Sequence, residues 1–272
     1  MSRPERVMKK TYCVHGFPLL LCNSCARQST CVHGVLQQNC LACFIYNPSS
    51  LYGIVGAAAV TQCEDVPLKA HIDGKGYVQN AKFVHKPIPA LEKGAITGPK
   101  AIVLHRTDSS NLESSLQSFK KGVGTHFIVD KDGTVTQTAS LLKETSHVGK
   151  IKSRCYESGT CPADEKAKIK SWGWAPQKVH DHEKVKSYPA RYPMNEDSVG
   201  IEVVAKNNNE VWEAATPAQL VSITTIVRIL QNAYGLGEAD IYEHDQVSYK
   251  KPGEGADLYH GPDGGKLLQA NK

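Results

Sequence analysis

The sequence predicts a domain of the α/β class, preceded by a small metal-stabilised module. Three observations lead to this prediction. From residue 101 onward, short apolar runs alternate with a helix-like periodicity, as strands and helices that share one core do. A Cys/His motif occurs twice near the N-terminus. The chain has 272 residues, which is enough for one domain of ordinary size and one small accessory module.

The N-terminal motif reads C-x-H-G-x5-C-x-x-C, and its two copies are offset by 18 residues. Each copy supplies three cysteines and one histidine, a complete tetrahedral set for structural zinc. Ligands can pair within each copy or across the two copies. A disulfide knot is the alternative, but it leaves the paired histidines unexplained. We therefore expect two structural zinc ions, with the ligands Cys13, His15, Cys22, Cys25, Cys31, His33, Cys40 and Cys43.

The chain is predicted to have three parts, with boundaries near residues 46 and 98. Residues 1–46 are too few to build a large core, so metal would supply most of their folding free energy. Residues 47–98 are rich in Gly, Ala and Pro without a helical period, which is typical of a linker and peripheral segment. Residues 99–272 form the main domain, with an insertion at about 150–194.

The strands of the main domain are expected where short apolar runs occur. Residues 101–105 and 198–205 read as buried central strands. Residues 126–130 and 134–137 flank a Lys-Asp-Gly turn and predict a hairpin. Residues 239–243 predict a short strand that ends at a histidine.

Two helices are predicted between these strands. Residues 111–120 can form a helix with Ser109 or Ser110 as its cap. The segment 216–234 carries the clearest helix signal, with a Thr cap, Pro at the first position and Gly235 at the end. Its apolar residues recur at helical spacing, at positions 220, 223, 227 and 230.

The insertion is long and polar, and a loop of this size inside a domain is usually functional or disordered. It carries Trp172 and Trp174, which are expected to stack on sugar rings at a substrate groove. The alternative is that these aromatic rings fold the loop onto the domain. Cys155 and Cys161 are predicted to form a small disulfide if the protein works in an oxidising compartment.

Several of the apolar runs end at or near a histidine or a glutamate. His105 ends the first strand, Glu202 lies in the motif Ser-Val-Gly-Ile-Glu, and His244 follows the last strand. Buried strands deliver such side chains to the rim of a sheet. Two histidines, an acidic third ligand and a separate carboxylate make a catalytic zinc site with an open position.

With these motifs in this order, residues from about 101 to about 259 resemble the zinc-dependent N-acetylmuramoyl-L-alanine amidase family. That family includes phage amidase lysozymes, bacterial muropeptide amidases and animal peptidoglycan recognition proteins. The resemblance covers a little over half the chain. It implies a central mixed β-sheet flanked by helices, and hydrolysis of the amide bond between N-acetylmuramic acid and L-alanine in peptidoglycan.

The resemblance also implies a ligand set for one catalytic zinc ion. His105 and His244 match the two histidine ligands. The family's third ligand lies ten positions past the second histidine, in a Lys-containing loop. Here that position is Glu254, within an altered motif, with Asp257 as the alternative. A carboxylate oxygen of either residue can bind zinc.

Further roles follow from the same resemblance. Glu202 would act as general base and then general acid, since Thr125 replaces the tyrosine that some phage members use. Lys251, or else Lys250, would stabilise the oxyanion. The residues expected to bind substrate or support the site are His126, His147, Asn195, Trp172 and Trp174.

The charged N-terminus is not followed by an apolar segment, so no signal peptide is expected. The longest apolar runs, near residues 18–22 and 53–60, are too short to span a bilayer. We expect synthesis in the cytoplasm and action on the periplasmic cell wall, after lysis or specialised secretion. A net charge of +5 favours anionic partners only weakly.

The sequence therefore favours a bacteriolytic enzyme, either an endolysin or a secreted antibacterial effector, with peptidoglycan as substrate. A delivery or immunity protein is a candidate partner. Nucleic acid is not expected, because the Cys/His module lacks a basic helix with interleaved aromatics. Two alternatives stay open: a non-catalytic peptidoglycan-binding protein, and an adaptor whose partner binds residues 1–46.

Overall fold

The computed structural model describes residues 70–261, of which residues 70–259 belong to one compact unit. The Cys/His repeat and residues 47–69 of the predicted linker lie outside the described residues, so the two structural zinc sites stay predictions. Residues 70–98 of that segment are described and carry β1, β2 and β3. Within the described part, no helix is long and apolar enough to cross a membrane.

The centre of the domain is a mixed six-stranded sheet in the order β10-β4-β7-β5-β6-β3. Four of the five neighbouring pairs are parallel, and only β5 and β6 form an antiparallel hairpin. This is the mixed sheet that the sequence predicts. In chain order, the strands are β3 (Phe83–His85), β4 (Ala101–Arg106), β5 (Phe127–Val129), β6 (Val135–Gln137), β7 (Ser198–Val203) and β10 (Ile241–Glu243).

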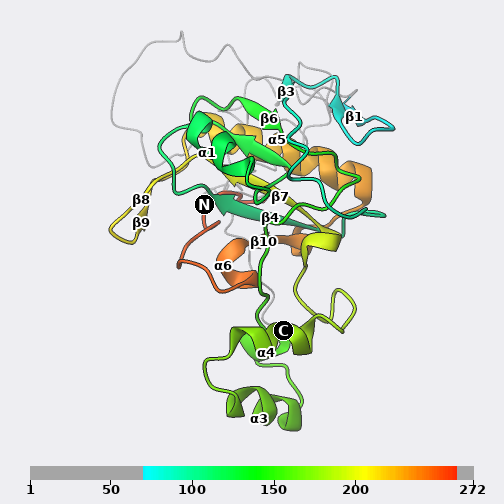
Figure 1. Cartoon of the computed structure of the whole chain (residues 1–272), viewed down its shortest axis with the longest axis vertical. Coiled ribbons are helices and arrows are strands. Elements are labelled where there is room, and N and C mark those ends of the chain that lie inside the picture. The colour runs from blue at the N-terminus through cyan, green and yellow to red at the C-terminus, as the bar shows by residue number, and fades with distance from the viewer. Residues whose placement is uncertain (1–69, 262–272) are drawn as a thin grey trace, which may run out of the picture. The chain divides into compact units, whose positions relative to one another are not determined.

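The two longest strands, β4 and β7, lie side by side in the middle of the sheet (Figure 1). Every residue of β4 is buried, and only Glu202 of β7 is partly exposed. Continuous apolar runs are expected for parallel strands that are covered on both faces. Their register pairs His105 with Glu202, so both side chains stand on the same face of the sheet.

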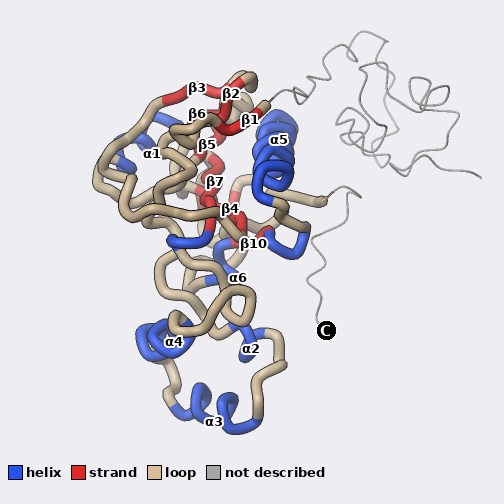
Figure 2. Tube along the Cα trace, turned by 90° about the vertical axis from the view of Figure 1, so that its right-hand side faces the viewer, coloured by secondary structure: helices blue, strands red, loops and turns tan. Residues whose placement is uncertain are grey.

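Helices α1 (Leu112–Phe119) and α5 (Pro217–Tyr234) lie on opposite sides of this sheet (Figure 2). Helix α5 has the predicted Thr216 cap, and Gly235 ends it in the left-handed conformation. Helix α1 is capped by Asn111 and not by a preceding serine, because the Asn111 side chain accepts from the Ser114 amide. Leu116 and Phe119 of α1 pack in a core cluster with Ile128 of the sheet.

The predicted insertion is a helical projection at one end of the sheet (Figures 1 and 2). Cys155 and Cys161 form the expected disulfide. Where the chain returns, the Tyr188 hydroxyl donates to Asp240 at 2.6 Å, which fastens the projection to the sheet. Its helices are α2 (Arg154–Glu157), α3 (Ala163–Ser171) and α4 (Pro176–Glu183).

The remaining elements are short and peripheral, apart from the one-turn helix α6, which begins at His244 directly after β10. The peripheral elements are β1 (His71–Ile72), β2 (Val78–Gln79), η4 (Asn195–Asp197), β8 (Asn207–Asn208), β9 (Val211–Trp212) and η5 (Glu238–Asp240). Helix α6 spans His244–Val247.

Candidate metal centre

Three strands end at the same edge of the sheet and carry the candidate site. His105 lies near the end of β4, Glu202 faces it from β7, and His244 follows β10. These three strands are mutually parallel neighbours, so their carboxyl ends meet. Ligand sites in open α/β sheets form at such ends.

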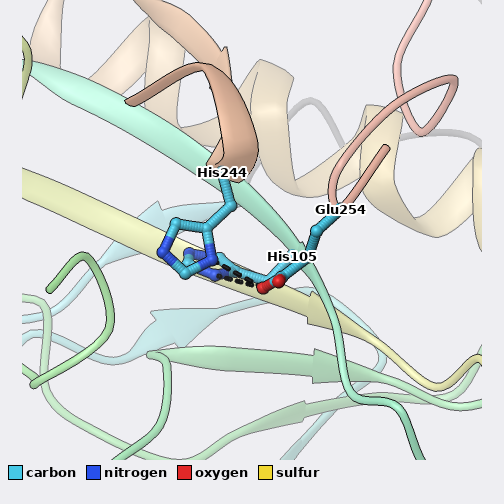
Figure 3. Close-up of side chains that lie close together, drawn as sticks. All are labelled: His105, His244 and Glu254. Atoms are coloured by element: carbon cyan, nitrogen blue, oxygen red, sulfur yellow. Dashed lines mark hydrogen bonds and ion pairs between the residues drawn. The ribbon is translucent and has the colours of Figure 1, made fainter. Parts of the chain in front are cut away.

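Two histidines and one carboxylate converge there. The Glu254 Oε1 atom lies 2.6 Å from Nδ1 of His244 and 3.9 Å from Nδ1 of His105 (Figure 3). One ligand atom from each residue lies within 4.8 Å of the others, and Asp257 is not part of this group. Two imidazoles and a carboxylate are a donor set that binds zinc and leaves a fourth position open. The three residues fit the predicted metal.

The loop that carries Glu254 is held against the end of β4. Its Gly253 carbonyl accepts a hydrogen bond from Arg106 at 2.9 Å, and its Gly253 amide donates to Asp245 at 2.7 Å. Gly255 has a φ of +98°, and a Cβ there would lie 2.4 Å from the Leu104 carbonyl oxygen. Only glycine permits this close approach, so Gly255 helps to aim the preceding carboxylate at the histidines.

A chain of hydrogen bonds fixes which nitrogen of His105 faces the site. The Ser198 hydroxyl donates to the Met194 carbonyl at 2.7 Å, so its oxygen accepts from Nε2 of His147 at 3.3 Å. Nδ1 of His147 then accepts from Nε2 of His105 at 3.1 Å. The lone pair of His105 is therefore on Nδ1, toward Glu254. Such partners set the tautomer and orientation of metal-binding histidines.

His244 is oriented in the same way. Its Nε2 donates to the Val148 carbonyl at 2.9 Å, which turns Nδ1 toward the Glu254 carboxylate at 2.6 Å. Burial and the neighbouring His244 and His147 hold the pKa of His105 well below its usual value. His105 is therefore neutral at physiological pH, which is the protonation state that metal binding requires.

Glu202 is the carboxylate next to this group. Burial and the nearby charge of Glu254 raise the pKa of Glu202 to about 8, against the opposing charge of Lys250. A carboxyl with a pKa raised toward neutral pH is suited to exchange protons during a reaction.

The two adjacent lysines differ in their surroundings. Lys251 lies 2.7 Å from an Asp108 carboxylate oxygen, and 59% of its side chain is exposed. The positive charge of Lys250 instead lowers the pKa values of Glu202, His105 and His147. The electrostatic effect of Lys250 on these groups thus favours it over the first-choice Lys251 as the cation of the site.

His126 and His147 support the site from inside the domain and do not offer a free nitrogen to substrate. His126 is fully buried, donates from Nε2 to the Lys143 carbonyl and accepts from the Gly200 amide at Nδ1. This contradicts a substrate-binding role for His126. Both nitrogens of His147 are used in the chain that orients His105.

Asn195 fixes the segment that carries His147. Its side-chain oxygen accepts from the His147 amide at 3.1 Å and from the Val148 amide at 2.9 Å. Asn195 therefore acts on the backbone that supports both candidate histidine ligands, because the Val148 carbonyl orients His244.

The two tryptophans of the insertion have different environments. Trp172 packs edge-on against His182 inside the insertion, with ring centroids 5.5 Å apart. Trp174 is 82% exposed and lies beside Tyr249, with ring centroids 5.2 Å apart. Trp174 thus remains available to a ligand, whereas Trp172 helps to fold the insertion.

Three groups near the site were not predicted from the sequence: Ser198, Tyr249 and the Val148 carbonyl. Ser198 opens the Ser-Val-Gly-Ile-Glu motif, which was a usable signal. Tyr249 precedes the two lysines, but nothing local to the sequence indicates that Trp174 meets it. The Val148 contact is a backbone interaction between segments that are distant in the chain, so no residue type marks it.

The comparisons with known proteins give one match by family. The family model described as N-acetylmuramoyl-L-alanine amidase matches residues 96–255, more than half of the chain. No curated protein matches the chain.

Several solved structures are similar in part. The N-acetylmuramoyl-L-alanine amidase LysC from Clostridium intestinale URNW is 22% identical, with a TM-score of 0.37, over 64% of this chain and 91% of that one. An AmpD derivative is 15% identical, with a TM-score of 0.41, over 65% of this chain and 88% of that one. The amidase AmiD from E. coli is 16% identical, with a TM-score of 0.38, over 66% of this chain and 58% of that one.

Proposed function

The chain belongs to the N-acetylmuramoyl-L-alanine amidase family, and we propose that it hydrolyses its peptidoglycan substrate with a zinc ion held by His105, His244 and Glu254. The amide bond between N-acetylmuramic acid and L-alanine is the target. The observation that carries the zinc proposal is the convergence of two histidine Nδ1 atoms and one carboxylate oxygen. In each histidine the other ring nitrogen, Nε2, already donates a hydrogen bond: that of His105 to His147 and that of His244 to the Val148 carbonyl.

The residues around this group have the properties that amide hydrolysis needs. Zinc, when bound, lowers the pKa of a bound water and polarises a carbonyl oxygen. Glu202 takes a proton from the attacking water and delivers it to the nitrogen of the leaving amine. The positive charge of Lys250, which acts on Glu202 and His105, stabilises the carbonyl oxygen as it becomes negative.

We propose a bacteriolytic role at the cell wall, as an endolysin or a delivered antibacterial effector. The family's substrate is peptidoglycan, and the N-terminal Cys/His repeat provides a second module that docking or delivery would use. A peptidoglycan-binding protein without activity is the second candidate. It is favoured by one observation, the altered motif around Glu254, and it predicts binding to the wall without cleavage.

Digestion of purified peptidoglycan tests the reaction. The wild-type protein should release free stem peptides that begin with L-alanine, as identified by mass spectrometry. Glu202→Gln should bind the same amount of zinc and release none. Glu210→Gln, at an exposed glutamate in the β8–β9 hairpin, is the matched control and should retain activity. If wild type and Glu202→Gln both bind the wall and neither cleaves it, the protein is a binding protein.

The zinc requirement and the biological role have separate tests. Chelation should abolish release of stem peptides, and added zinc should restore it. Expression in bacteria should lyse the cells when the protein is directed to the periplasm, but not when it stays in the cytoplasm. Absence of lysis by a periplasmic protein that cleaves purified wall would contradict the bacteriolytic role.

A further inference from the structure

The helical insertion contains little apolar core of its own. Helix α2 buries no residue, and α3 buries only Ile169. Helix α4 buries Val179 and Glu183, and the latter is a charged residue. Small segments with so little apolar burial are usually held by crosslinks or metal ions.

A cluster of metal-binding side chains lies where these helices meet. The Sγ atoms of Cys155 and Cys161 and a carboxylate oxygen of Glu165 all lie within 4.8 Å of one another. Glu165 belongs equally to a second group, with His182 and Glu183. Its Oε1 atom is 2.8 Å from Nε2 of His182. Cysteine, histidine and glutamate are all donor types that zinc accepts, and Glu165 is the residue that the two groups share.

The charges of this cluster are not balanced. Glu183 is fully buried, its Oε1 atom accepts from Lys186 at 2.7 Å, and its Oε2 atom has no hydrogen-bond partner among the described residues. The same lysine also binds Glu165 at 2.6 Å. Lys186 thus pairs with both carboxylates, and Glu165 has His182 as a second partner, whereas the completely buried Glu183 has only Lys186. A buried carboxylate without full compensation favours the approach of a further cation.

We propose that Cys155, Cys161, Glu165 and His182 bind one zinc ion when the disulfide is reduced. A dithiol reductant supplies two electrons and two protons to the Cys155–Cys161 bond and is itself oxidised to a disulfide. The two thiols then lose their protons as they bind zinc. Ligand atoms around tetrahedral zinc lie about 3 to 4 Å apart. Glu165 is grouped with the cysteines and also with His182, so the freed cysteine side chains have to turn toward His182 to complete the site. Lys186 remains paired with Glu183.

This site would give the insertion a crosslink in both redox environments. Zinc would hold it in a reducing compartment, and the disulfide would hold it in an oxidising one. A protein that is synthesised under reducing conditions and acts outside the cell would need both. The inference does not rest on the amidase activity, because it concerns only the insertion.

Metal analysis of the full chain tests the proposal. Wild type, His182→Ala and the matched control His85→Ala are reduced with a phosphine, loaded with zinc and freed of excess metal. His85 lies on β3, the edge strand opposite β10. Reduced wild type and His85→Ala should each hold one more zinc ion per chain than His182→Ala. After reoxidation of the Cys155–Cys161 bond, all three should hold equal amounts. Equal zinc content of the reduced wild type and reduced His182→Ala overturns the proposal.

Thiol alkylation gives a second measurement that does not depend on metal counts. In the reduced wild type, zinc should protect Cys155 and Cys161 from an alkylating agent, as located by peptide mass spectrometry. His182→Ala should lose most of that protection, although its disulfide form folds normally. Equal alkylation of both cysteines with and without zinc in the wild type would overturn the site. Glu202→Gln should retain the protection even if the amidase proposal fails.

Discussion

Replacing Glu202 by glutamine should change how the stability of the metal-free domain depends on pH. The pKa of this carboxyl is raised from 4.5 to about 8 in the folded chain by burial and by the charge of Glu254. In the unfolded chain the carboxyl returns to its ordinary value. Between these two values the folded state therefore holds a proton that the unfolded state has released. The free energy of unfolding must then fall as the pH rises through this range.

The window from pH 7 to pH 8 isolates this effect. Below a pH of about 6.5 the buried neutral histidines act in the opposite direction, because the unfolded chain binds protons that His105 and His147 exclude. Over the chosen window the native Glu202 carboxyl goes from about nine-tenths to about half protonated, which corresponds to a loss of about 1 kcal/mol. Because the side chain is partly exposed to solvent, this figure is an upper bound.

The assay is urea unfolding of the chelator-treated protein at pH 7, 7.5 and 8, followed by tryptophan fluorescence. All three tryptophans lie at positions 172, 174 and 212, within the described domain, so the signal reports this domain. From pH 7 to pH 8, the unfolding free energy of the wild type should fall by up to about 1 kcal/mol relative to that of Glu202→Gln. The unfolding free energy of the control Glu210→Gln should change with pH in the same way as that of the wild type.

A difference that stays constant from pH 7 to pH 8 would refute the reasoning. It would mean that Glu202 is already ionised at neutral pH in the metal-free protein, and that burial does not hold its proton. Zinc should also abolish the dependence, because a divalent cation nearby favours the ionised carboxylate.

Three further predictions concern the positioning of the site. Ser198→Ala removes the acceptor for His147 and should weaken zinc binding by about 10- to 100-fold in a chelator competition. The lost buried hydroxyl should also cost about 1–3 kcal/mol in urea unfolding; unchanged zinc affinity would contradict the hydrogen-bond chain. Gly255→Ala forces a Cβ against the β4 backbone, and should cost about 1–3 kcal/mol in urea unfolding and reduce bound zinc. Lys250→Ala should lower kcat on peptidoglycan by about 100-fold or more, whereas Lys251→Ala should change it only slightly. A larger loss of kcat in Lys251→Ala would mean that Lys251 stabilises the oxyanion.

Much of the main domain was predictable because its signals are local. The apolar run before His105 predicts a buried strand, and the Thr-Pro start and glycine end of α5 predict that helix closely. Capping depends on short-range hydrogen bonds and backbone conformation, so the sequence carries it directly. Helix α1 shows the limit of this approach, since Asn111 supplied the cap in place of the adjacent serines.

The fold class and the residue types of the candidate site could be read from the amino-acid sequence. His105, Glu202 and His244 lie at or near strand ends, and a strand places its last residues at the rim of a sheet. Glu254 was chosen because the resemblance to the amidase family implies a ligand ten positions past the second histidine. The Cys155–Cys161 disulfide could be chosen from its separation in the chain. These features depend on covalent connectivity and local conformation.

The role of each supporting side chain depends on contacts that form only in the folded domain. His126 became a buried structural link and His147 a support for His105, because partners from other strands use all of their ring nitrogens. Lys250 and Lys251 are neighbours in sequence, but Asp108, from a distant loop, pairs with only the second. Hydrogen bonds, burial and charge at these positions come from segments far apart along the chain, and only folding brings such segments together.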